Sequence, residues 1–103
     1  MTDLEWLIGW YQRHVDGEWE HQHGVTIATL DNPGWSLRVD LVGTALRDVP
    51  FASEEQEDGT RWTRFWKDDS AGVFNAAGDA TSLPAMIRRF RAWAEGSPSL
   101  VEE

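Results

Sequence analysis

The side chains best suited to chemistry gather just after residue 17. Six residues hold two carboxylates and two imidazoles, in Glu18, Glu20, His21 and His23. On a strand, His21 and His23 would share a face, because successive side chains point to opposite sides. Imidazole and carboxylate are common metal ligands. The pattern therefore allows a small metal-binding protein or enzyme, although two histidines without a second cluster fit polar residues at a strand edge better.

Sequence motifs of the common enzyme classes are missing. The 103 residues contain no cysteine, so thiol catalysis, disulfides and thiolate–metal sites are excluded. There is no nucleophile elbow, phosphate-binding loop, dinucleotide fingerprint or zinc-protease motif. Carboxylate pairs for glycoside hydrolysis are available in so acidic a chain, but nothing fixes their spacing. We predict a protein that is not an enzyme and needs no cofactor.

The charge balance limits the partners. Eighteen Asp and Glu oppose nine Lys and Arg, which gives a net charge of −9. Such a chain should repel nucleic acid and anionic membranes and attract cationic partners, although acidity also serves solubility alone. No apolar run approaches the roughly 18 residues of a membrane span, and the first residues lack the basic segment of a signal peptide. We expect a cytoplasmic protein with no nucleic-acid or membrane partner.

The first predicted element is a helix over residues 3–15. Thr2 and Glu5 have the spacing of a capping box, and Asp16-Gly17 ends the helix. Apolar side chains at helical spacing predict a buried stripe, with Trp6 and Trp10 flanking it. The residues of this stripe are Leu4, Leu7, Ile8, Tyr11 and Val15.

Two strands, over residues 22–30 and 36–43, are predicted to form a hairpin. If their apolar side chains share one face, the loop must contain an odd number of residues. A five-residue loop, Asp31 to Trp35, fits this parity, with Pro33 and Gly34 as the central residues of its turn. Trp35 is then either a plug folded onto the core or a surface anchor. The predicted core-face pairs are Thr29–Leu37, Ile27–Val39 and Val25–Leu41, with Arg38 and Asp40 on the other face.

The rest of the chain predicts further strands and a closing helix. The segment 53–59 carries four carboxylates and no apolar side chain, so a solvated loop is expected. Strands are expected near 45–49, 60–67 and 72–75, with a turn over 75–79. The helix over 83–95 follows Ser82 as N-cap, exposes Arg88, Arg89 and Arg91, and precedes a frayed tail over 97–103. Its buried stripe is Leu83, Met86, Ile87, Phe90, Trp93 and Ala94.

These elements predict an α+β fold. An N-terminal helix is followed by an antiparallel meander of four to five strands, because hairpin-length connections exclude a parallel sheet. The C-terminal helix packs on the sheet, and both helices cover one face. The length fits a single domain over residues 1–103.

A family resemblance extends over most of the chain. The residues that carry it are Trp6-Leu7, Trp10-Tyr11, Trp19-Glu20-His21, Gly24-Val25, Ile27, the run from Thr29 to Trp35, Asp40-Leu41, Phe90 and Trp93. Together they resemble the pattern of bacterial immunity protein family 53. The resemblance implies a small protein, encoded beside a polymorphic toxin, that binds and neutralises that toxin.

The resemblance and the acidity lead to one function and two alternatives. The leading hypothesis is direct binding of a cognate toxin domain, such as a basic nuclease, because charge steers the capture of a cationic partner. The alternatives are the metal-binding protein or enzyme described above and a ligand-binding module that uses exposed tryptophans. The identity of the toxin and the oligomeric state stay open. The predicted partner-binding residues are Glu18, Glu20, Asp31, Trp35, Glu54 and Glu55.

Overall fold

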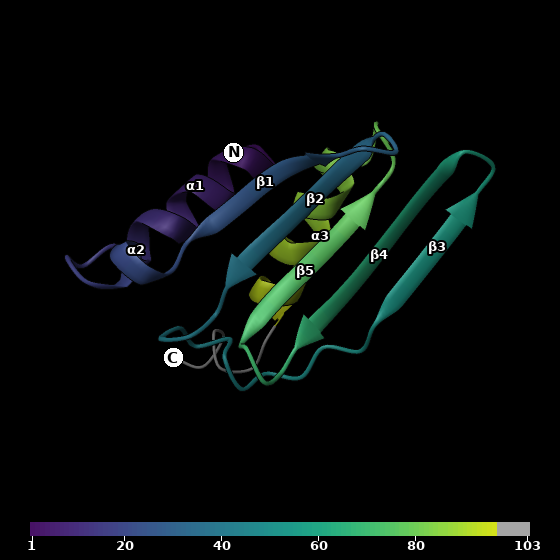
Figure 1. Ribbon diagram of the computed structural model, residues 1–103. Coiled ribbons are helices and arrows are strands. Elements are labelled where there is room, and N and C mark those ends of the chain that lie inside the picture. Colours follow the sequence, from purple (N-terminus) through teal and green to yellow (C-terminus); the bar gives the residue numbers. More distant parts are fainter. Residues whose placement is uncertain (97–103) are drawn as a thin grey trace.

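The computed structural model describes residues 1–96 as a sheet with helices packed on it (Figure 1). All neighbouring strands are antiparallel, in the order β1-β2-β5-β4-β3. The α+β class and both long helices are confirmed. In one respect the order differs from a meander, since β5 inserts between β2 and β4. The elements are α1 Asp3–His14, α2 Trp19–Gln22, β1 Val25–Leu30, β2 Gly34–Asp40, β3 Glu54–Asp58, β4 Arg61–Asp68, β5 Val73–Gly78 and α3 Leu83–Gly96.

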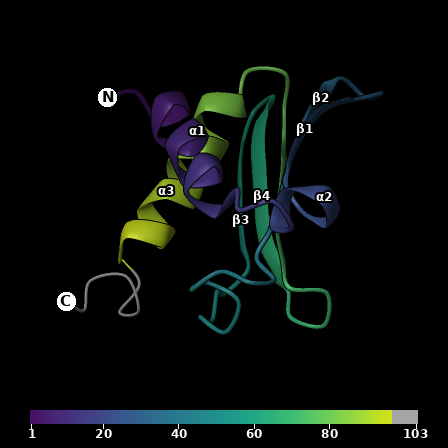
Figure 2. The same ribbon diagram turned by 90° about the vertical axis from the view of Figure 1, so that its left-hand side faces the viewer.

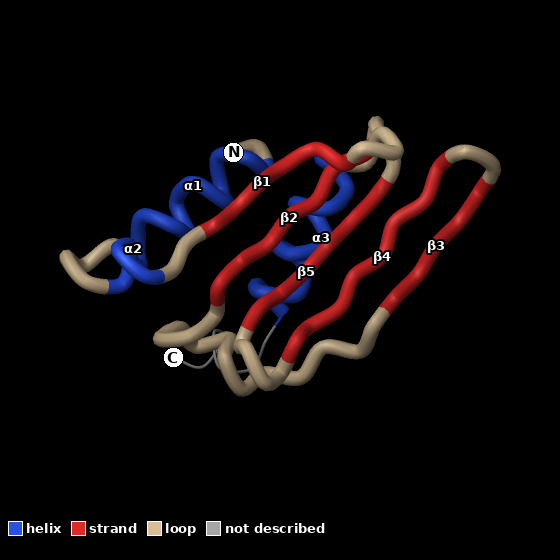
Figure 3. Tube along the Cα trace, in the orientation of Figure 1, coloured by secondary structure: helices blue, strands red, loops and turns tan. Residues whose placement is uncertain are grey.

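The core lies between the sheet and the two long helices. Figure 2 shows α1 and α3 on the same side of the sheet, as predicted, and Figure 3 shows α3 behind the central strands. Leu37 and Val39 of β2 and Phe74 of β5 face α3, whose Phe90 is fully buried. The stripe predicted for α3 is confirmed, with Leu83 and Trp93 partly buried and the others buried. The predicted tail over 97–103 falls outside the described residues.

Helix α1 begins as predicted but buries a different face. Thr2 and Glu5 form both hydrogen bonds of the capping box. The prediction that Leu4 and Ile8 are buried is wrong, since they are 50% and 51% exposed. Val15 is also exposed and Tyr11 is only partly buried; of the predicted stripe Leu7 alone is buried. The core instead takes Trp6 and Trp10, whose rings contact Phe90, because large aromatic side chains remove more apolar area from water.

The β1–β2 hairpin has the predicted parity but a shorter loop. Leu30 pairs with Gly34, so the loop holds three residues, 31–33, and the predicted five-residue loop is wrong. The three predicted pairs are each shifted by two residues, which preserves the face of every side chain. Gly34 lies in β2 and has no positive φ. A Cβ there would collide with the Gly78 carbonyl oxygen, so this glycine permits a close approach of two strands.

Several local predictions between the long helices are wrong. The acidic loop expected over 53–59 is strand β3, and no strand forms over 44–51, which is a series of turns. Strand β5 runs through the turn expected over 75–79. Lys67 of β4 ties the turn region to the sheet, since its Nζ donates to the Val49 carbonyl at 2.6 Å and lies 3.3 Å from Asp69. The Lys67 side chain is 3% exposed.

Candidate interaction surface

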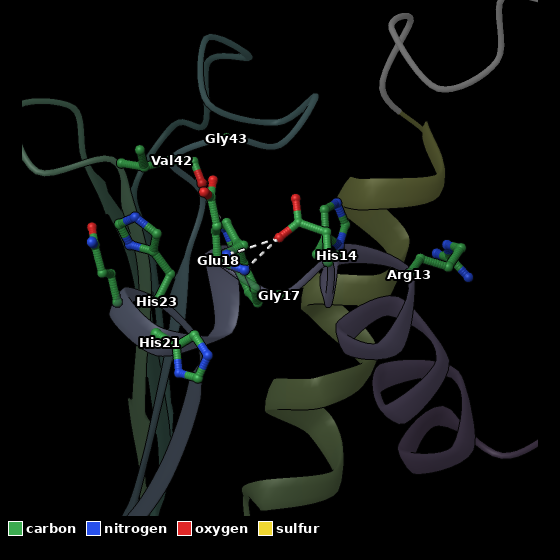
Figure 4. Close-up of a pocket in the computed structure, with 11 residues that line it drawn as sticks. Arg13, His14, Gly17, Glu18, His21, His23, Val42 and Gly43 are labelled. Carbon is green, nitrogen blue, oxygen red and sulfur yellow. Dashed lines mark hydrogen bonds between the residues drawn. The ribbon is translucent and has the colours of Figure 1, made fainter.

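The predicted residues near 18–23 form a corner between α1 and β1, where Figure 4 shows Glu18, His21 and His23. Residues 19–22 form the short helix α2, so the prediction that His21 and His23 share a strand face is wrong. Trp19 is buried, and its indole N–H donates to the Val42 carbonyl at 2.7 Å. The rings of Trp10, Tyr11, His14 and His23 lie around it, at centroid distances of 6.2, 5.9, 5.5 and 5.9 Å.

Two carboxylates of this corner bind backbone N–H groups. Glu20 accepts from the N–H groups of Asp16 and Gly17, at 3.0 and 2.9 Å. Hydrogen bonds from its own N–H and from those two lower the pKa of Glu20. Asp16 accepts from the Trp19 and Glu18 N–H groups, which likewise lower the pKa of Asp16. Both carboxylates therefore hold the turn between α1 and α2, while Glu18 is exposed beside them.

The described residues that line the hollow in Figure 4 do not form a metal site. It is open to solvent and is lined by His14, Glu18, His21 and His23, among others. Across residues 1–96, no group of three or more histidines and carboxylates has the geometry to hold a metal ion. The Nδ1 of His14 lies 2.8 Å from the Trp10 carbonyl, which orients that ring within its own helix. His14 and His23 thus extend the aromatic packing around Trp19, whereas His21 is exposed.

Trp35 lies in the sheet and packs against the core. It pairs with Thr29 and Gly78 rather than lying in a loop outside the strands, as the sequence had suggested. Its side chain is partly buried against the core, and its indole N–H donates to the Ala80 carbonyl at 3.0 Å. The tryptophan therefore connects the hairpin to the segment that leads into α3. Asp31, in the adjacent loop, is exposed.

Asp79 is a structural carboxylate that the sequence did not single out. It accepts from the Trp62 N–H at 2.7 Å, from the N–H and hydroxyl of Thr81 at 2.8 and 2.6 Å, and from the Ser82 hydroxyl at 2.7 Å. Hydrogen bonds from the Thr81 and Ser82 side chains, followed by the backbone N–H groups, hold the pKa of Asp79 far below its usual value. A carboxylate that stays ionised in this way is a poor proton donor. The spacing Asp79-x-Thr81-Ser82 before a helix was the available signal.

Glu54 and Glu55 of β3 point to opposite faces of the sheet. Glu54 forms a two-point ion pair with Arg89 of α3, at 2.9 and 2.6 Å. That hydrogen-bonded pair lowers the pKa of Glu54 and raises the pKa of Arg89. Glu55 is exposed on the face without helices and lies 3.2 Å from Arg64. Adjacent carboxylates in the sequence thus serve different surfaces.

The six predicted contact residues do not form one surface. Glu18 and Glu20 lie at the α1–α2 corner, Asp31 in the β1–β2 loop with Trp35 near the start of β2, and Glu54 and Glu55 on the far edge strand. On the face without helices, β4 presents Trp62, Arg64 and Trp66. The Arg64 guanidinium lies 5.7 Å from the Trp62 ring centre, and Trp66 is 39% exposed.

A second apolar surface, which sequence reasoning misassigned to the core, lies between α1 and β1. Ile27 of β1 is 38% exposed and lies in this groove with the outward half of α1. The groove has a volume of about 440 Å³ and little polar lining. The helical spacing of Leu4, Ile8 and Tyr11 was the signal for this surface, and it was interpreted as a core stripe. The α1–β1 groove is lined by Leu4, Leu7, Ile8, Tyr11, His23, Gly24, Val25 and Ile27.

Comparison with known proteins identifies the family. The family model described as Immunity protein 53 matches residues 4–95. The chain belongs to the Immunity protein 53 family. No curated protein and no solved structure matches the chain. Membership confirms the resemblance seen in the sequence and supports an immunity function. Among the described residues, no helix has the length and apolar character to cross a membrane.

Proposed function

We propose that this Immunity protein 53 member neutralises a cognate bacterial toxin domain by binding it directly, in the cytoplasm of the cell that makes both. The family match over residues 4–95 carries the proposal. An inhibitor of this kind needs a stable surface of about 800 Å² rather than a catalytic pocket. The chain exposes 6,408 Å² in all, so the area required is a modest share of its surface.

The charge of the chain supports a basic toxin, such as a nuclease. A net charge of −9 raises the rate at which a cationic partner is captured and disfavours acidic competitors. Exposed carboxylates suited to contact are Glu18, Asp31 and Glu55. Glu20, Glu54 and Trp35 are held by internal hydrogen bonds, so their part is to position the surface.

The two alternative functions receive less support. A metal-binding role for His21 and His23 lacks a third ligand among residues 1–96, and Glu20 is occupied by backbone N–H groups. A ligand-binding role would need a deep pocket lined by tryptophans. The hollow beside Trp19 is instead open to solvent, and its lining is more polar than apolar.

Co-expression tests the proposal. The toxin domain encoded beside this chain is expressed in a bacterial host together with this protein, with an empty vector, or with an unrelated acidic protein of similar size. We expect growth only with this protein, and a stable complex of the two purified proteins in calorimetry. Survival equal to that with the empty vector would contradict the proposal. Rescue by the unrelated acidic protein would assign the effect to charge alone.

A further inference from the structure

Within residues 1–96, strand β1 is an open edge of the sheet that lacks the usual protection against strand pairing. Its six residues, VTIATL, include no charge and no proline. Edge strands of natural proteins are commonly shielded by charged side chains, proline or a covering element, because exposed backbone groups pair with other strands. A β-branched, uncharged edge in a chain of net charge −9 is therefore a marked exception within the molecule.

The register shows which backbone groups of β1 are free to pair. The Asp40 N–H donates to the Gly24 carbonyl at 3.0 Å, and Val25 pairs with Val39. In an antiparallel pair of strands, hydrogen-bonded residue pairs alternate with pairs that are not hydrogen-bonded to each other. The N–H and C=O groups of residues 24, 26, 28 and 30 therefore face β2. Those of Val25, Ile27 and Thr29 consequently face the open edge, and the side chains of the same three residues lie on the face that carries the helices.

Helix α1 extends beyond the edge that β1 forms. Helix α3 contacts both β2 and β5, so its axis lies above the space between them. Helix α1 packs against α3 on the side of β1, and Figure 1 shows it beyond that strand. Packed helix axes lie roughly 8–10 Å apart and paired strands roughly 4.8 Å apart, so the α1 axis falls about half a strand spacing outside β1. The outward half of α1 thus overhangs the position of a sixth strand.

The exposed apolar side chains occur where that strand would lie. Leu4 and Ile8 of α1 are about half exposed, and with Tyr11 and Ile27 they line the α1–β1 groove. A strand paired to β1 would place alternate side chains in this groove. The position of α1 and the exposure of its apolar side chains therefore both indicate space for a sixth strand beside β1.

We infer that β1 accepts an extended segment of the toxin domain as a sixth strand, with apolar side chains at alternate positions seated under α1. This inference rests on the proposed function. The segment carries no carboxylate, because the acidic remainder of the chain would repel one. Main-chain pairing supplies affinity in such strand addition, and the groove supplies selectivity.

A second copy of the chain does not fit this edge in the antiparallel arrangement. If two β1 strands paired antiparallel, the two-fold axis between them would be perpendicular to the sheet. Both α1 helices would then lie on the same face, each above the edge strand of the other copy. Both helix axes would then fall within the roughly 4.8 Å between the two strands, whereas packed helices need about 8–10 Å. An approaching strand must therefore have no helix above its own edge, which suits an extended segment.

Amide hydrogen exchange tests the inference at single residues. In the free protein, the amides of Val25, Ile27 and Thr29 should exchange quickly, while those of Thr26 and Ala28 are protected by β2. Addition of the purified toxin domain encoded beside this chain should slow the three edge amides by about tenfold or more. Amides of β3, at the opposite edge, serve as the internal control and should not change.

A matched pair of substitutions provides the second measurement. Ile8→Lys places a charge in the groove and should weaken toxin binding in calorimetry by about tenfold or more. Ala92→Lys places the same charge at an exposed position of α3 outside the groove and should leave affinity within about twofold. Thermal unfolding of both variants verifies that each is folded.

The outcomes separate this inference from the function on which it rests. Complex formation with unchanged exchange at the three edge amides would overturn the sixth-strand inference and leave toxin binding intact. Failure of the unaltered protein to bind would overturn both. Protection of the edge amides in the free protein, together with a dimeric mass in solution, would assign the edge to a second copy of the chain and overturn the toxin assignment.

Discussion

The sheet ends in two edge strands that are built in opposite ways. Strand β1 presents six uncharged residues, whereas β3, EEQED, presents four carboxylates in five residues. The β1 side is fixed at its ends by buried or partly buried indoles, Trp19 bonded to Val42 and Trp35 bonded to Ala80. The β3 side is fixed by an ion pair between Glu54 and Arg89.

One sheet can therefore be closed to strand pairing at one edge and available for it at the other. Carboxylates along β3 repel acidic partners and keep the strand solvated, so pairing there is unfavourable. These indole contacts are made by the neighbours of β1, Trp19 of α2 and Trp35 of β2, and do not use the outer backbone groups of β1. An edge strand can therefore be held to the fold by neighbouring side chains while its outer N–H and C=O groups stay available for strand pairing.

Among the side chains that hold the two edges of the sheet, Trp35 should have the largest effect on stability when it is replaced. Trp35→Ala removes a partly buried indole and its hydrogen bond to Ala80, so the free energy of unfolding should fall by about 2–3 kcal/mol in urea denaturation. The matched control is Trp66→Ala, on the face without helices, which should cost less than about 1 kcal/mol. Unchanged stability with lost toxin binding would make Trp35 a surface anchor instead.

Acid should have the second-largest effect on the stability of the folded protein. The pKa values of Asp16, Glu20, Glu54 and Asp79 are lowered by hydrogen bonds in the folded protein. Lowered values stabilise the fold above the unfolded pKa, about 4 for carboxylic acids, and this stabilisation is lost as pH falls through the folded values. Melting temperature should therefore decrease steadily below about pH 5. A profile that stays level down to pH 3 would contradict this assignment.

The ion pair that holds β3 should contribute less. A double-mutant cycle with Glu54→Gln and Arg89→Met should give a coupling of about 1 kcal/mol or less, because solvent screens a pair whose side chains are 38% and 31% exposed. The pair Glu55–Arg64, at 72% and 62% exposure, is the matched control and should show almost no coupling. Equal coupling in both cycles would mean that Arg89 does not anchor β3.

Substitution in the α1–β1 groove should have the smallest effect on the isolated protein. Ile8→Gln should change the free energy of unfolding by less than about 0.5 kcal/mol, since the side chain is half exposed. Leu7→Ala, one residue earlier on the buried face, should cost about 2–5 kcal/mol. A loss of similar size from both variants would show that the groove belongs to the core, and the contrast between the edges would no longer hold.

The sequence correctly predicted those features that depend only on residues close to one another along the chain. The capping box at Thr2 and Glu5 and the buried stripe of α3 both depend on residues within a few turns of one helix. The parity argument also predicted which faces of β1 and β2 lie together. It could not choose between loops of three and five residues, because both are odd and both keep the apolar side chains of the two strands on one face.

The errors occurred where tertiary neighbours outweigh sequence pattern. Helix α1 has apolar residues on two faces, and only the position of α3 determines that Trp6 and Trp10 are buried while Ile8 is not. Segment 54–58 lacks apolar side chains because an edge strand can be solvated, which composition cannot distinguish from a loop. Of the candidate site, the exposed carboxylates were predictable, but the groove required knowledge of where α1 lies relative to β1.

The chain contains a single lysine, and its ammonium group is enclosed by the fold. Lys67 is held between Val49 and Asp69, while every other cationic side chain apart from histidine is arginine. Amine-directed reagents therefore meet no accessible lysine side chain as long as β4 stays in place. Acylation of Lys67 would report separation of the turn region from the sheet, so the protein carries its own chemical probe of unfolding, one that leaves both edge strands unlabelled.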